Sequence, residues 1–240
     1  MSERHLLAPP AASRPARPWY TRPELVERYE SWYEGPTGIR MDRQEKAVLR
    51  RMLDEAGWLG PRARLLEVGA GTGHFTRWLK GLAGRVVGVD LSPLMLRKAR
   101  ELGTTGLVGG DAARLPFASG SFDAAVLVAC FEYMPHPVRV LQEVARVARC
   151  GLVLGLMNRR SVAGVRRRLQ VALGRNDFFE GAHLYTLGEI RRLAREAFGG
   201  HARLAWRFTL YPPGIPVASS PVGGGSFLAV RVELPGSSRR

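Results

Sequence analysis

Short apolar runs alternate with amphipathic stretches along the middle of the chain. Runs of this length, dense in Val, Leu and Ala, predict strands that are buried on both faces. Strands that alternate with helices predict an α/β fold with a parallel sheet. The expected strands are residues 65–68, 85–90, 106–111, 124–129 and 151–157, and the expected helices are 74–81, a helix from 93 onward and 138–148.

Further elements are expected on both sides of this α/β core. Thr186 and Glu189 have the spacing of a capping box, which predicts the start of a helix. A Pro- and Gly-rich loop separates two β runs near the carboxyl terminus. These elements are helices from Pro23, over 42–56, over 162–173 and from Thr186 to Phe198, and β runs over 201–210 and 226–234.

The strand at 65–68 ends in the most informative loop of the chain. Glu67 precedes Gly69, Gly71 and Gly73, and a helix is expected directly after them. Glycines tolerate positive φ and carry no Cβ atom, so a ligand can approach the backbone and the free N–H groups of the following helix. In the dinucleotide-binding fingerprint the third glycine would stand at position 74, where this chain has His74. The loop therefore belongs to another nucleotide-type class, unless it is a tight turn that binds nothing.

Acidic residues end the next two expected strands. These residues are Asp90 and Asp111. Because open α/β sheets bind ligands at the carboxyl ends of their strands, both carboxylates are expected beside the glycine loop. Asp90 can accept hydrogen bonds from both hydroxyls of a ribose, and Asp111 can accept one from an adenine amino group, with Leu91 and Ala112 on the two sides of the ring. A helix-capping or strand-end role is the alternative for Asp90.

Four short segments follow one another between residue 62 and about residue 157. They are Leu-Glu-Val-Gly-Ala-Gly-Thr-Gly, Val-Gly-Val-Asp-Leu-Ser-Pro, Gly-Asp-Ala-Ala-Arg-Leu-Pro-Phe and Ser-Phe-Asp. In this order and spacing they resemble the type 11 family of class I S-adenosylmethionine-dependent methyltransferases. The resemblance implies an α/β fold with a Rossmann-like seven-stranded sheet, mostly parallel with its last strand antiparallel, and helices on both faces. The two β runs near the carboxyl terminus fit the antiparallel pair of such a sheet.

The resemblance also implies that the cofactor is S-adenosyl-L-methionine. Glu67 would contact the amino end of its methionine portion, and Gly69 and Gly71 would admit the methionine chain. Asp90 would hold the ribose, and Asp111 would recognise the adenine. The expected cofactor-binding residues are Glu67, Gly69, Ala70, Gly71, Asp90, Leu91, Asp111, Ala112 and Cys130.

The expected function is methyl transfer to a small-molecule acceptor. Residues 130–137 lack the Asn/Asp-Pro-Pro-aromatic motif that DNA and some RNA amino-methyltransferases carry after the fourth strand, and they offer Glu132, Tyr133 and His136 as polar candidates. The sulfonium already makes the methyl group electrophilic, so a base is optional and no catalytic residue is assigned. The alternatives are an RNA methyltransferase and a non-catalytic protein that keeps the cofactor fold as an interaction module.

A net charge of +15 changes this picture only in part. Arg outnumbers Lys 33 to 3 along the whole chain, which indicates a compositional bias, so binding to nucleic acid is expected to be nonspecific. No apolar run reaches the roughly 18–20 residues of a membrane span, and no signal-peptide core is present, so a cytoplasmic protein is expected. Cys130 and Cys150 are expected near opposite ends of neighbouring strands and unbridged. No metal-ligand cluster stands out, and the oligomeric state is not predicted.

The chain divides into three expected parts. Residues 1–18, rich in Pro, Ala and Arg, are expected to be a disordered tail. Residues 19–60 are expected to form a helical flap over the cofactor pocket, with packing on the flank of the sheet as the alternative. Residues 61–240 are expected to form the cofactor-binding domain. The aromatic residues of the flap are Tyr29, Trp32 and Tyr33.

A basic amphipathic helix is expected over residues 162–173. Its apolar residues have helical spacing, with three successive arginines on the other side. Such a helix either touches a membrane surface or an acidic substrate, or presents a solvated basic face over a packed apolar stripe. The residues are Val162, Val165, Leu169 and Leu173 on the stripe, and Arg166, Arg167 and Arg168 opposite.

Overall fold

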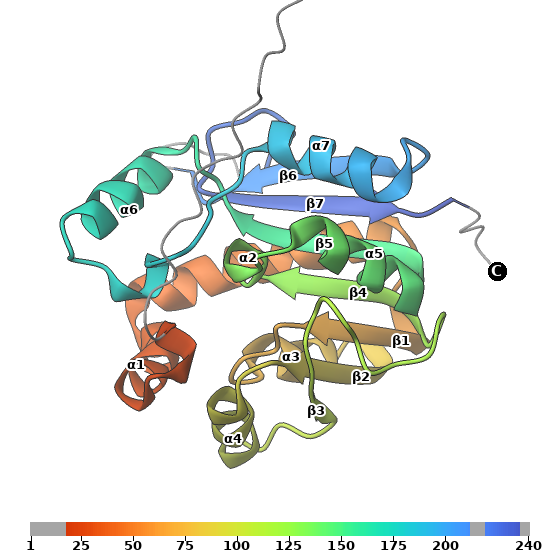
Figure 1. Ribbon diagram of the computed structural model, residues 1–240, viewed down its shortest axis with the longest axis horizontal. Helices are drawn as coiled ribbons and strands as arrows, with labels where there is room; N and C mark the ends of the chain where they lie inside the picture. Colours follow the sequence, from red (N-terminus) through yellow and green to blue (C-terminus); the bar gives the residue numbers. More distant parts are fainter. Residues whose placement is uncertain (1–17, 212–218, 236–240) are drawn as a thin grey trace, which may run out of the picture.

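The computed structural model describes residues 18–211 and 219–235. The expected disordered tail, residues 1–18, lies outside this described part except for Pro18. The remaining chain forms a central sheet with helices on both faces, as Figure 1 shows.

Seven strands form this sheet. They are β1 (Gly60–Val68), β2 (Ala83–Asp90), β3 (Leu107–Gly109), β4 (Phe122–Val128), β5 (Ala148–Met157), β6 (Arg203–Thr209) and β7 (Phe227–Glu233). Their order across the sheet is β3-β2-β1-β4-β5-β7-β6. The pairs among β1 to β5 are parallel, whereas β7 is antiparallel to both β5 and β6. The expected Rossmann-like topology, mostly parallel with an antiparallel last strand, is confirmed.

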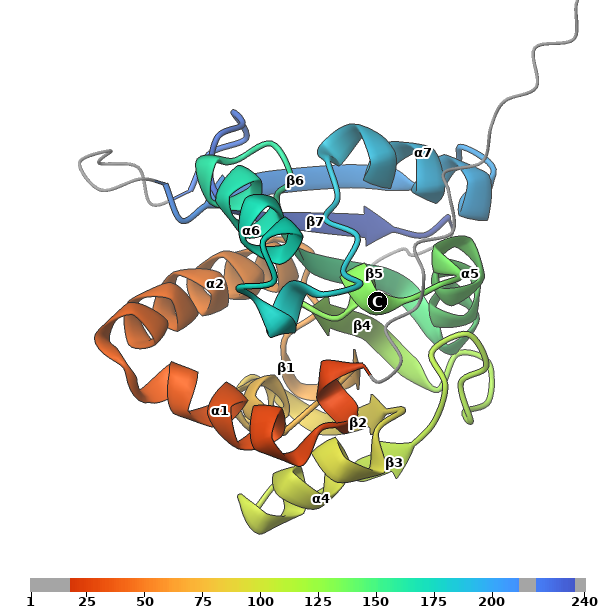
Figure 2. The ribbon, with the colours of Figure 1, turned by 60° about the vertical axis from the view of Figure 1, so that its left-hand side comes forward.

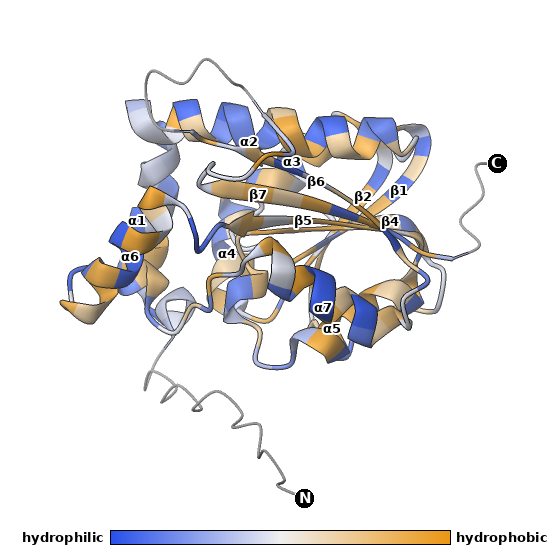
Figure 3. Cartoon of the chain, turned by 90° about the horizontal axis from the view of Figure 1, so that it is seen from above, coloured by the Kyte–Doolittle hydropathy of each residue, from blue (hydrophilic) through white to orange (hydrophobic). Residues whose placement is uncertain are grey.

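Helices cover both faces of the sheet. They are α1 (Pro23–Glu34), α2 (Pro36–Glu55), α3 (His74–Leu79), α4 (Pro93–Glu101), α5 (Pro137–Val147), α6 (Val162–Ala172) and α7 (Leu187–Phe198), with 3-10 turns η1 (Trp19–Thr21), η2 (Phe131–Tyr133) and η3 (Asp177–Phe179). Seen from above in Figure 3, α2 and α3 lie on one side of the strands, and α5 and α7 on the other.

The central strands bury side chains on both of these faces. Leu65 of β1 and Val126 of β4 pack against α2 and α3, whereas their neighbours Leu66 and Leu127 pack against α5 and α7. Because successive residues of a strand point to opposite faces, a sheet covered twice requires a continuous apolar run. This requirement explains why these strands were visible as unbroken apolar runs in the sequence.

The chain changes direction across the sheet between β1 and β4. The connection after β1 enters α3 on one face, and the connection after β4 leads to α5 on the other. Such a switch point leaves a crevice outside the carboxyl ends of the strands, where open α/β sheets bind ligands. Helices α1 and α6 lie beyond this edge of the sheet in Figures 1 and 2.

Two local expectations were wrong. Helix α2 begins at Pro36 and not near residue 42, because Gly35 precedes it in an extended conformation and proline suits the first helical turn. Gly38 therefore lies inside α2, where a Cβ atom would come within 1.9 Å of the Trp32 carbonyl oxygen. That glycine permits a close approach of α1 and α2, and the break between these helices lies at Gly35.

The second wrong expectation concerns α6. The interpretation that its apolar stripe packs under a solvated basic face fails, because the stripe faces outward. Arg167, expected on the solvated side, is half-buried and lines a cavity instead. The exposed fractions are 76% for Val162, 58% for Val165, 59% for Leu169 and 56% for Leu173.

No helix within residues 18–211 and 219–235 is long and apolar enough to cross a membrane. The cytoplasmic location expected from the sequence stays a prediction. Cys130, just after β4, and Cys150, near the start of β5, are both free, as expected. Within the same described ranges, no group of three or more His, Cys, Asp or Glu side chains is placed to hold a metal ion.

The packing of β4 generates a test of stability. Leu127 is 0% exposed in this central strand, so Leu127→Ala is expected to lower the free energy of unfolding by about 2–5 kcal/mol through the cavity it leaves. Leu173→Ala, at a leucine that is 56% exposed, is the matched control and should change it by less than about 0.5 kcal/mol. Urea unfolding followed by circular dichroism measures both variants. Equal losses would contradict the packing described.

Candidate functional site

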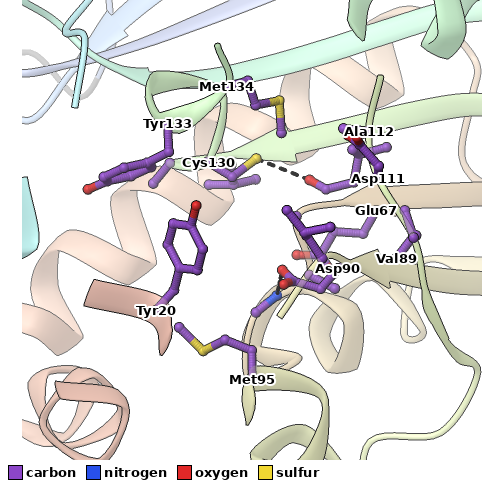
Figure 4. Close-up of a pocket in the computed structure, with 18 of the residues that line it drawn as sticks. Tyr20, Glu67, Val89, Asp90, Met95, Asp111, Ala112, Cys130, Tyr133 and Met134 are labelled. Atoms are coloured by element: carbon purple, nitrogen blue, oxygen red, sulfur yellow. Dashed lines mark hydrogen bonds between the residues drawn. The ribbon is translucent and has the colours of Figure 1, made fainter. Parts of the chain in front are cut away.

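A cavity lies at the carboxyl edge of the parallel strands, between the loops that follow β1, β2, β3 and β4. Figure 4 shows Tyr20 and Tyr133 on one side of this first cavity, with Asp90 and Asp111 on the other. All the residues expected from the sequence to bind a cofactor line it, although they come from four separate segments. They are Glu67, Gly69, Ala70, Gly71, Asp90, Leu91, Asp111, Ala112 and Cys130.

The glycine loop is held against β2 by its backbone. The N–H groups of Gly69 and Ala70 donate to the Val89 carbonyl oxygen, over 2.8 and 3.0 Å. At Gly69, with φ of +74°, a Cβ atom would come within 2.6 Å of the Cys130 Sγ atom. At Gly71, with φ of +55°, a Cβ atom would meet no atom within 4 Å, because the loop opens onto the cavity there. The loop thus presents bare backbone to whatever fills the cavity.

Asp90 ends β2 with its carboxylate fixed from two directions. One oxygen accepts the N–H of Gly71 and the other accepts the N–H of Ser92, each over 2.8 Å. Burial raises the pKa of Asp90, and the backbone N–H groups of Ser92, Gly71 and Leu91 oppose that rise. A carboxylate offers about four acceptor positions, so positions remain for the hydroxyl groups of a ligand. The carboxylate is therefore oriented by the fold before any ligand binds.

Glu67 supplies a second, more deeply buried carboxyl group. It is 2% exposed on β1 and lines the cavity. Burial, helped by the nearby charge of Asp90, raises its pKa to about 8, and a hydrogen bond from the Thr76 hydroxyl acts in the opposite direction. A cationic group in the cavity would favour the ionised form of Glu67. This geometry suits recognition of an ammonium group.

The other predicted residues form the open end and the wall of the cavity. Leu91 is 59% exposed although it is large and apolar, and Asp111 is an exposed carboxylate that accepts the N–H of Ala113 over 2.9 Å. The Cys130 thiol donates to the Val68 carbonyl oxygen over 3.1 Å, and burial raises its pKa well above the ordinary value. Cys130 is therefore a neutral packing group that joins the loop after β4 to β1.

Aromatic side chains from the amino-terminal segment form part of the wall of the first cavity. Trp19, Tyr20 and Tyr29 all line it. The Ser92 hydroxyl donates to the Tyr20 carbonyl oxygen over 2.7 Å, which joins η1 to the start of α4. The Trp19 ring lies 5.1 Å from that of Tyr29 and 6.1 Å from that of Tyr133, measured between ring centroids. The segment before α2 thus contacts the site directly.

A second, larger cavity of about 560 Å³ adjoins the first. This volume lies within the range of roughly 300–1,000 Å³ that small-molecule sites occupy. Much of its wall is aromatic or aliphatic, and of the predicted flap residues Tyr29 lines both cavities whereas Trp32 and Tyr33 line only this one. The residues shared by the two cavities are Trp19, Tyr29, Phe75, Ala129 and Tyr133.

Three ionisable side chains of the second cavity have a buried polar atom without a hydrogen-bond partner in the described part of the chain. They are the Oε1 atom of Glu45, the Oε2 atom of Glu132 and the Nη1 atom of Arg167. Both glutamates are 3% exposed, and burial raises the pKa of Glu45 to about 8 and that of Glu132 to about 7. Leaving such atoms unpaired costs free energy, and all three groups belong to the wall of the second cavity.

Glu132 is already anchored at its other oxygen. The Oε1 atom accepts the Met157 N–H over 2.7 Å, which joins the turn η2 to the end of β5. Ala129 and Tyr133, which are close to Glu132 in the sequence, line both cavities. The free Oε2 atom therefore belongs to a side chain held near the junction of the two cavities.

Several residues that line the two cavities were not predicted from the sequence. Glu132 lines the second cavity and His136 the first, as candidates named from the sequence, but Trp19, Thr72 and Met95 were not foreseen in the first cavity. Glu45 carried a usable signal, because it stands three residues before Val48 on the buried side of α2. An acidic residue on the apolar stripe of a helix is a sign of a buried carboxyl group.

Comparison with known proteins agrees with this geometry. A family model described as a methyltransferase domain matches residues 66–154. A solved structure from Thermotoga maritima, named as an S-adenosylmethionine-dependent methyltransferase and possible histamine N-methyltransferase, is 25% identical. It has a TM-score of 0.67 and covers 90% of this chain and 99% of that one.

Two curated relatives extend the comparison. An uncharacterised protein of Mycobacterium tuberculosis is 30% identical over 190 residues, which are 78% of this chain but only 62% of the relative's length. The demethylmenaquinone methyltransferase of Tropheryma whipplei is 39% identical over 93 residues, 36% of this chain and 38% of that enzyme. The chain thus spans about three-fifths of the longer relative, and the match to the quinone enzyme covers little more than a third of each chain.

The buried carboxyl group of Glu45 generates a prediction about pH. Its folded-state pKa of about 8 lies above the ordinary value of 4.5. As the pH rises between these values, the unfolded chain releases the proton and the folded chain keeps it, so this group makes the fold less stable. Glu45→Gln stays neutral and is expected to be more stable than wild type by roughly 2–4 kcal/mol near pH 8, and nearly equal to it near pH 5.

Urea unfolding at the two pH values measures this difference, and Glu196→Gln provides the control. Glu196 is an exposed residue of α7, so its replacement should leave the pH dependence unchanged. A Glu45→Gln variant with the same stability relative to wild type at both pH values would show that Glu45 is not held protonated in the fold.

Proposed function

We propose that this chain, a member of the class I S-adenosylmethionine-dependent methyltransferases, transfers the cofactor's methyl group to a small-molecule acceptor. The observation that carries the proposal is the shared wall of two cavities. The first is lined by the cofactor-binding pattern, and the second is large, mostly apolar and supplied with unpaired polar atoms. Two adjoining cavities of this kind suit a cofactor and an acceptor that must meet end to end.

The residues of the first cavity fit S-adenosylmethionine. Gly71 leaves open space where a side chain would stand, and the Thr72 hydroxyl is buried without a partner in the described chain. We assign the ribose hydroxyls to Asp90, the ammonium group to Glu67, and the adenine to Asp111 with Leu91 and Ala112 on the sides of its ring. Gly69, Ala70 and Cys130 form the close wall beside the methionine portion.

When bound, S-adenosylmethionine supplies an electrophilic methyl group on a positively charged sulfur atom. The chain's own contribution is to position the acceptor and exclude water, which can lower the barrier by roughly 7–11 kcal/mol at best. Trp19, Tyr29 and Tyr133 stand at the junction of the cavities and would exclude water there. Glu132, whose Oε2 atom is unpaired, lies on the acceptor side. The pKa of its carboxyl group, about 7, suits a group that takes up a proton near neutral pH.

The second cavity favours an acceptor with a flat apolar body and a polar reacting end. Its aromatic walls suit the body, while Glu45, Glu132 and Arg167 offer both acceptors and a donor for hydrogen bonds. The names of two similar proteins support a small acceptor, since one is a possible histamine N-methyltransferase and the other a demethylmenaquinone methyltransferase. Neither name identifies the acceptor of this chain.

The two alternatives have less support. An RNA methyltransferase would be favoured by the charge of +15, yet residues 130–137 lack the motif that grips a planar amino group. A non-catalytic interaction protein would have no need to keep the Asp90 carboxylate oriented or the space at Gly71 open. Both features are present.

We also propose that the flap is the segment before α2. Residues 19–34 line both cavities, whereas α2 buries Val48, Leu49 and Met52 against the sheet. The proposed flap therefore covers only residues 19–34 of the 19–60 range expected from the sequence. Helix α2, which follows, packs on the sheet and also lines the second cavity through Thr37, Arg40, Met41 and Glu45.

The cofactor assignment predicts a loss of affinity in Asp90→Ala. Removal of two hydrogen bonds to a charged acceptor costs roughly 2–4 kcal/mol, which is about 30- to 1,000-fold in the dissociation constant. Calorimetry with S-adenosylhomocysteine measures this change. NAD is expected not to bind, because the loop spacing is not that of the dinucleotide fingerprint.

Asp123→Asn is the matched control for this experiment. Asp123 lies at the opposite end of β4, where it binds the Arg64 N–H and the Arg149 guanidinium. The affinity of the Asp123→Asn variant for S-adenosylhomocysteine should equal that of the wild-type chain. Tight binding of NAD, or wild-type affinity in Asp90→Ala, would contradict the assignment.

The flap proposal predicts that a chain without the flap still binds the cofactor but no longer transfers methyl groups. A chain that begins at Gly35 keeps α2 and should remain folded by circular dichroism, because the core on that face is retained. It should still bind S-adenosylhomocysteine but lose transfer of labelled methyl groups, because water enters the acceptor side. Unfolding of the truncated chain would show that residues 19–34 are structural, and full activity would show that they are not a flap.

A further inference from the structure

Helix α6 faces the protein with the opposite side from an ordinary surface helix. An ordinary surface helix buries its apolar stripe and exposes its polar side. In α6 the apolar stripe is exposed, and the side that faces the protein carries Gly164, which is buried, and Arg167, which lines the second cavity. The exposed side chains, named here the α6 apolar face, are Val162, Val165, Leu169 and Leu173.

The α6 apolar face is continuous and unusual within this molecule. At 100° per residue its four side chains fall within an arc of about 80°. Of the nine large apolar side chains exposed in the described chain, four belong to it. Figures 1 and 2 both place α6 at the periphery, beyond the carboxyl edge of the sheet. An apolar cluster of this kind on a protein surface marks a contact site.

Arginines flank the α6 apolar face on both sides. On the helical wheel Arg166 lies on one flank and Arg168 on the other, and the stretch 158–176 contains no acidic residue. Within the described residues, the exposed arginines of this stretch have no acidic partner. These exposed residues are Arg160, Arg166, Arg168 and Arg175.

We propose that the α6 apolar face docks on the surface of a membrane that contains anionic lipids. An apolar stripe with arginines along both flanks matches the boundary between acyl chains and negative headgroups, where the stripe enters the apolar layer and the arginines meet the phosphates. A second copy of this chain would bring two rows of arginines together without any acidic residue between them, so charge disfavours self-association here.

Docking would also place the second cavity next to the membrane. Residues on the inner side of α6, among them Ala163, Arg167 and Gln170, line that cavity, and so do Val162 and Arg166 at the edge of the α6 apolar face. An acceptor dissolved in the membrane would then have a short path to the site. The docking itself goes beyond the proposed methyl transfer and is measured without it.

Sedimentation of the full chain with lipid vesicles tests the proposal. The chain is expected to bind vesicles of phosphatidylcholine with phosphatidylglycerol, and to bind pure phosphatidylcholine at least about tenfold more weakly, because the arginines lack anionic partners there. The double variant V165S/L169S should lose about tenfold or more in binding to the mixed vesicles. Arg168→Gln should lose several-fold, with a weaker dependence on salt.

Matched controls separate this face from general stickiness and charge. Val222→Ser changes a valine that is 72% exposed elsewhere, and Arg50→Gln removes an exposed arginine of α2. Both should bind vesicles as wild type does, and every variant should keep the wild-type affinity for S-adenosylhomocysteine.

Three results would overturn the proposal. One is the absence of vesicle binding by the wild-type chain, and another is equal binding by V165S/L169S. The third is a concentration-dependent dimer, seen by light scattering and abolished in V165S/L169S, without vesicle binding, which would assign the face to a second copy. Failure of methyl transfer would leave the vesicle result unaffected, so the two proposals fail separately.

Discussion

The site depends on the contact between the glycine loop and the carboxyl end of β2. Gly69 and Ala70 donate to the Val89 carbonyl oxygen, and Gly71 donates to the Asp90 carboxylate. These bonds make the loop and the ligand-facing carboxylate one unit at the place where the chain changes direction across the sheet. Because the Gly71 N–H of this loop helps to hold the Asp90 carboxylate in position, a change in the loop or in Asp90 disturbs both.

Most of the fold and of the first cavity followed from local patterns. A strand buried on both faces must be an apolar run, and parallel strands bring their ends to one edge, so Glu67, Asp90 and Asp111 could be grouped from spacing alone. The structure brings all of them to one cavity. The capping box at Thr186 was equally readable, because its hydrogen bonds join residues three apart, and it is formed as expected.

The second cavity could not be predicted in the same way. Its polar atoms come from Glu45 on α2, Glu132 on η2 and Arg167 on α6, which are remote in sequence and meet only in the folded chain. Helix periodicity identifies a stripe but not which way it faces. The sequence therefore did not predict the orientation of α6, whose apolar side chains face outward, Val162 most of all.

The buried carboxyl groups separate the two halves of the site chemically. Glu67 faces the first cavity and Glu132 the second, and burial raises the pKa of both toward neutrality. In the proposed function the first is charged when a cationic cofactor binds, while the second can take up a proton from the acceptor. One physical cause, exclusion from water, thus supports two different roles.

The most direct test of the central claim is transfer of a labelled methyl group. The chain is incubated with methyl-labelled S-adenosylmethionine and cell extract, and the label is followed by mass spectrometry in small-molecule, RNA and protein fractions. The proposed function predicts label in a compound of the small-molecule fraction, with Asp90→Ala much reduced and Asp123→Asn unchanged. Label confined to RNA or protein, or no transfer by the wild-type chain to any fraction, would contradict it.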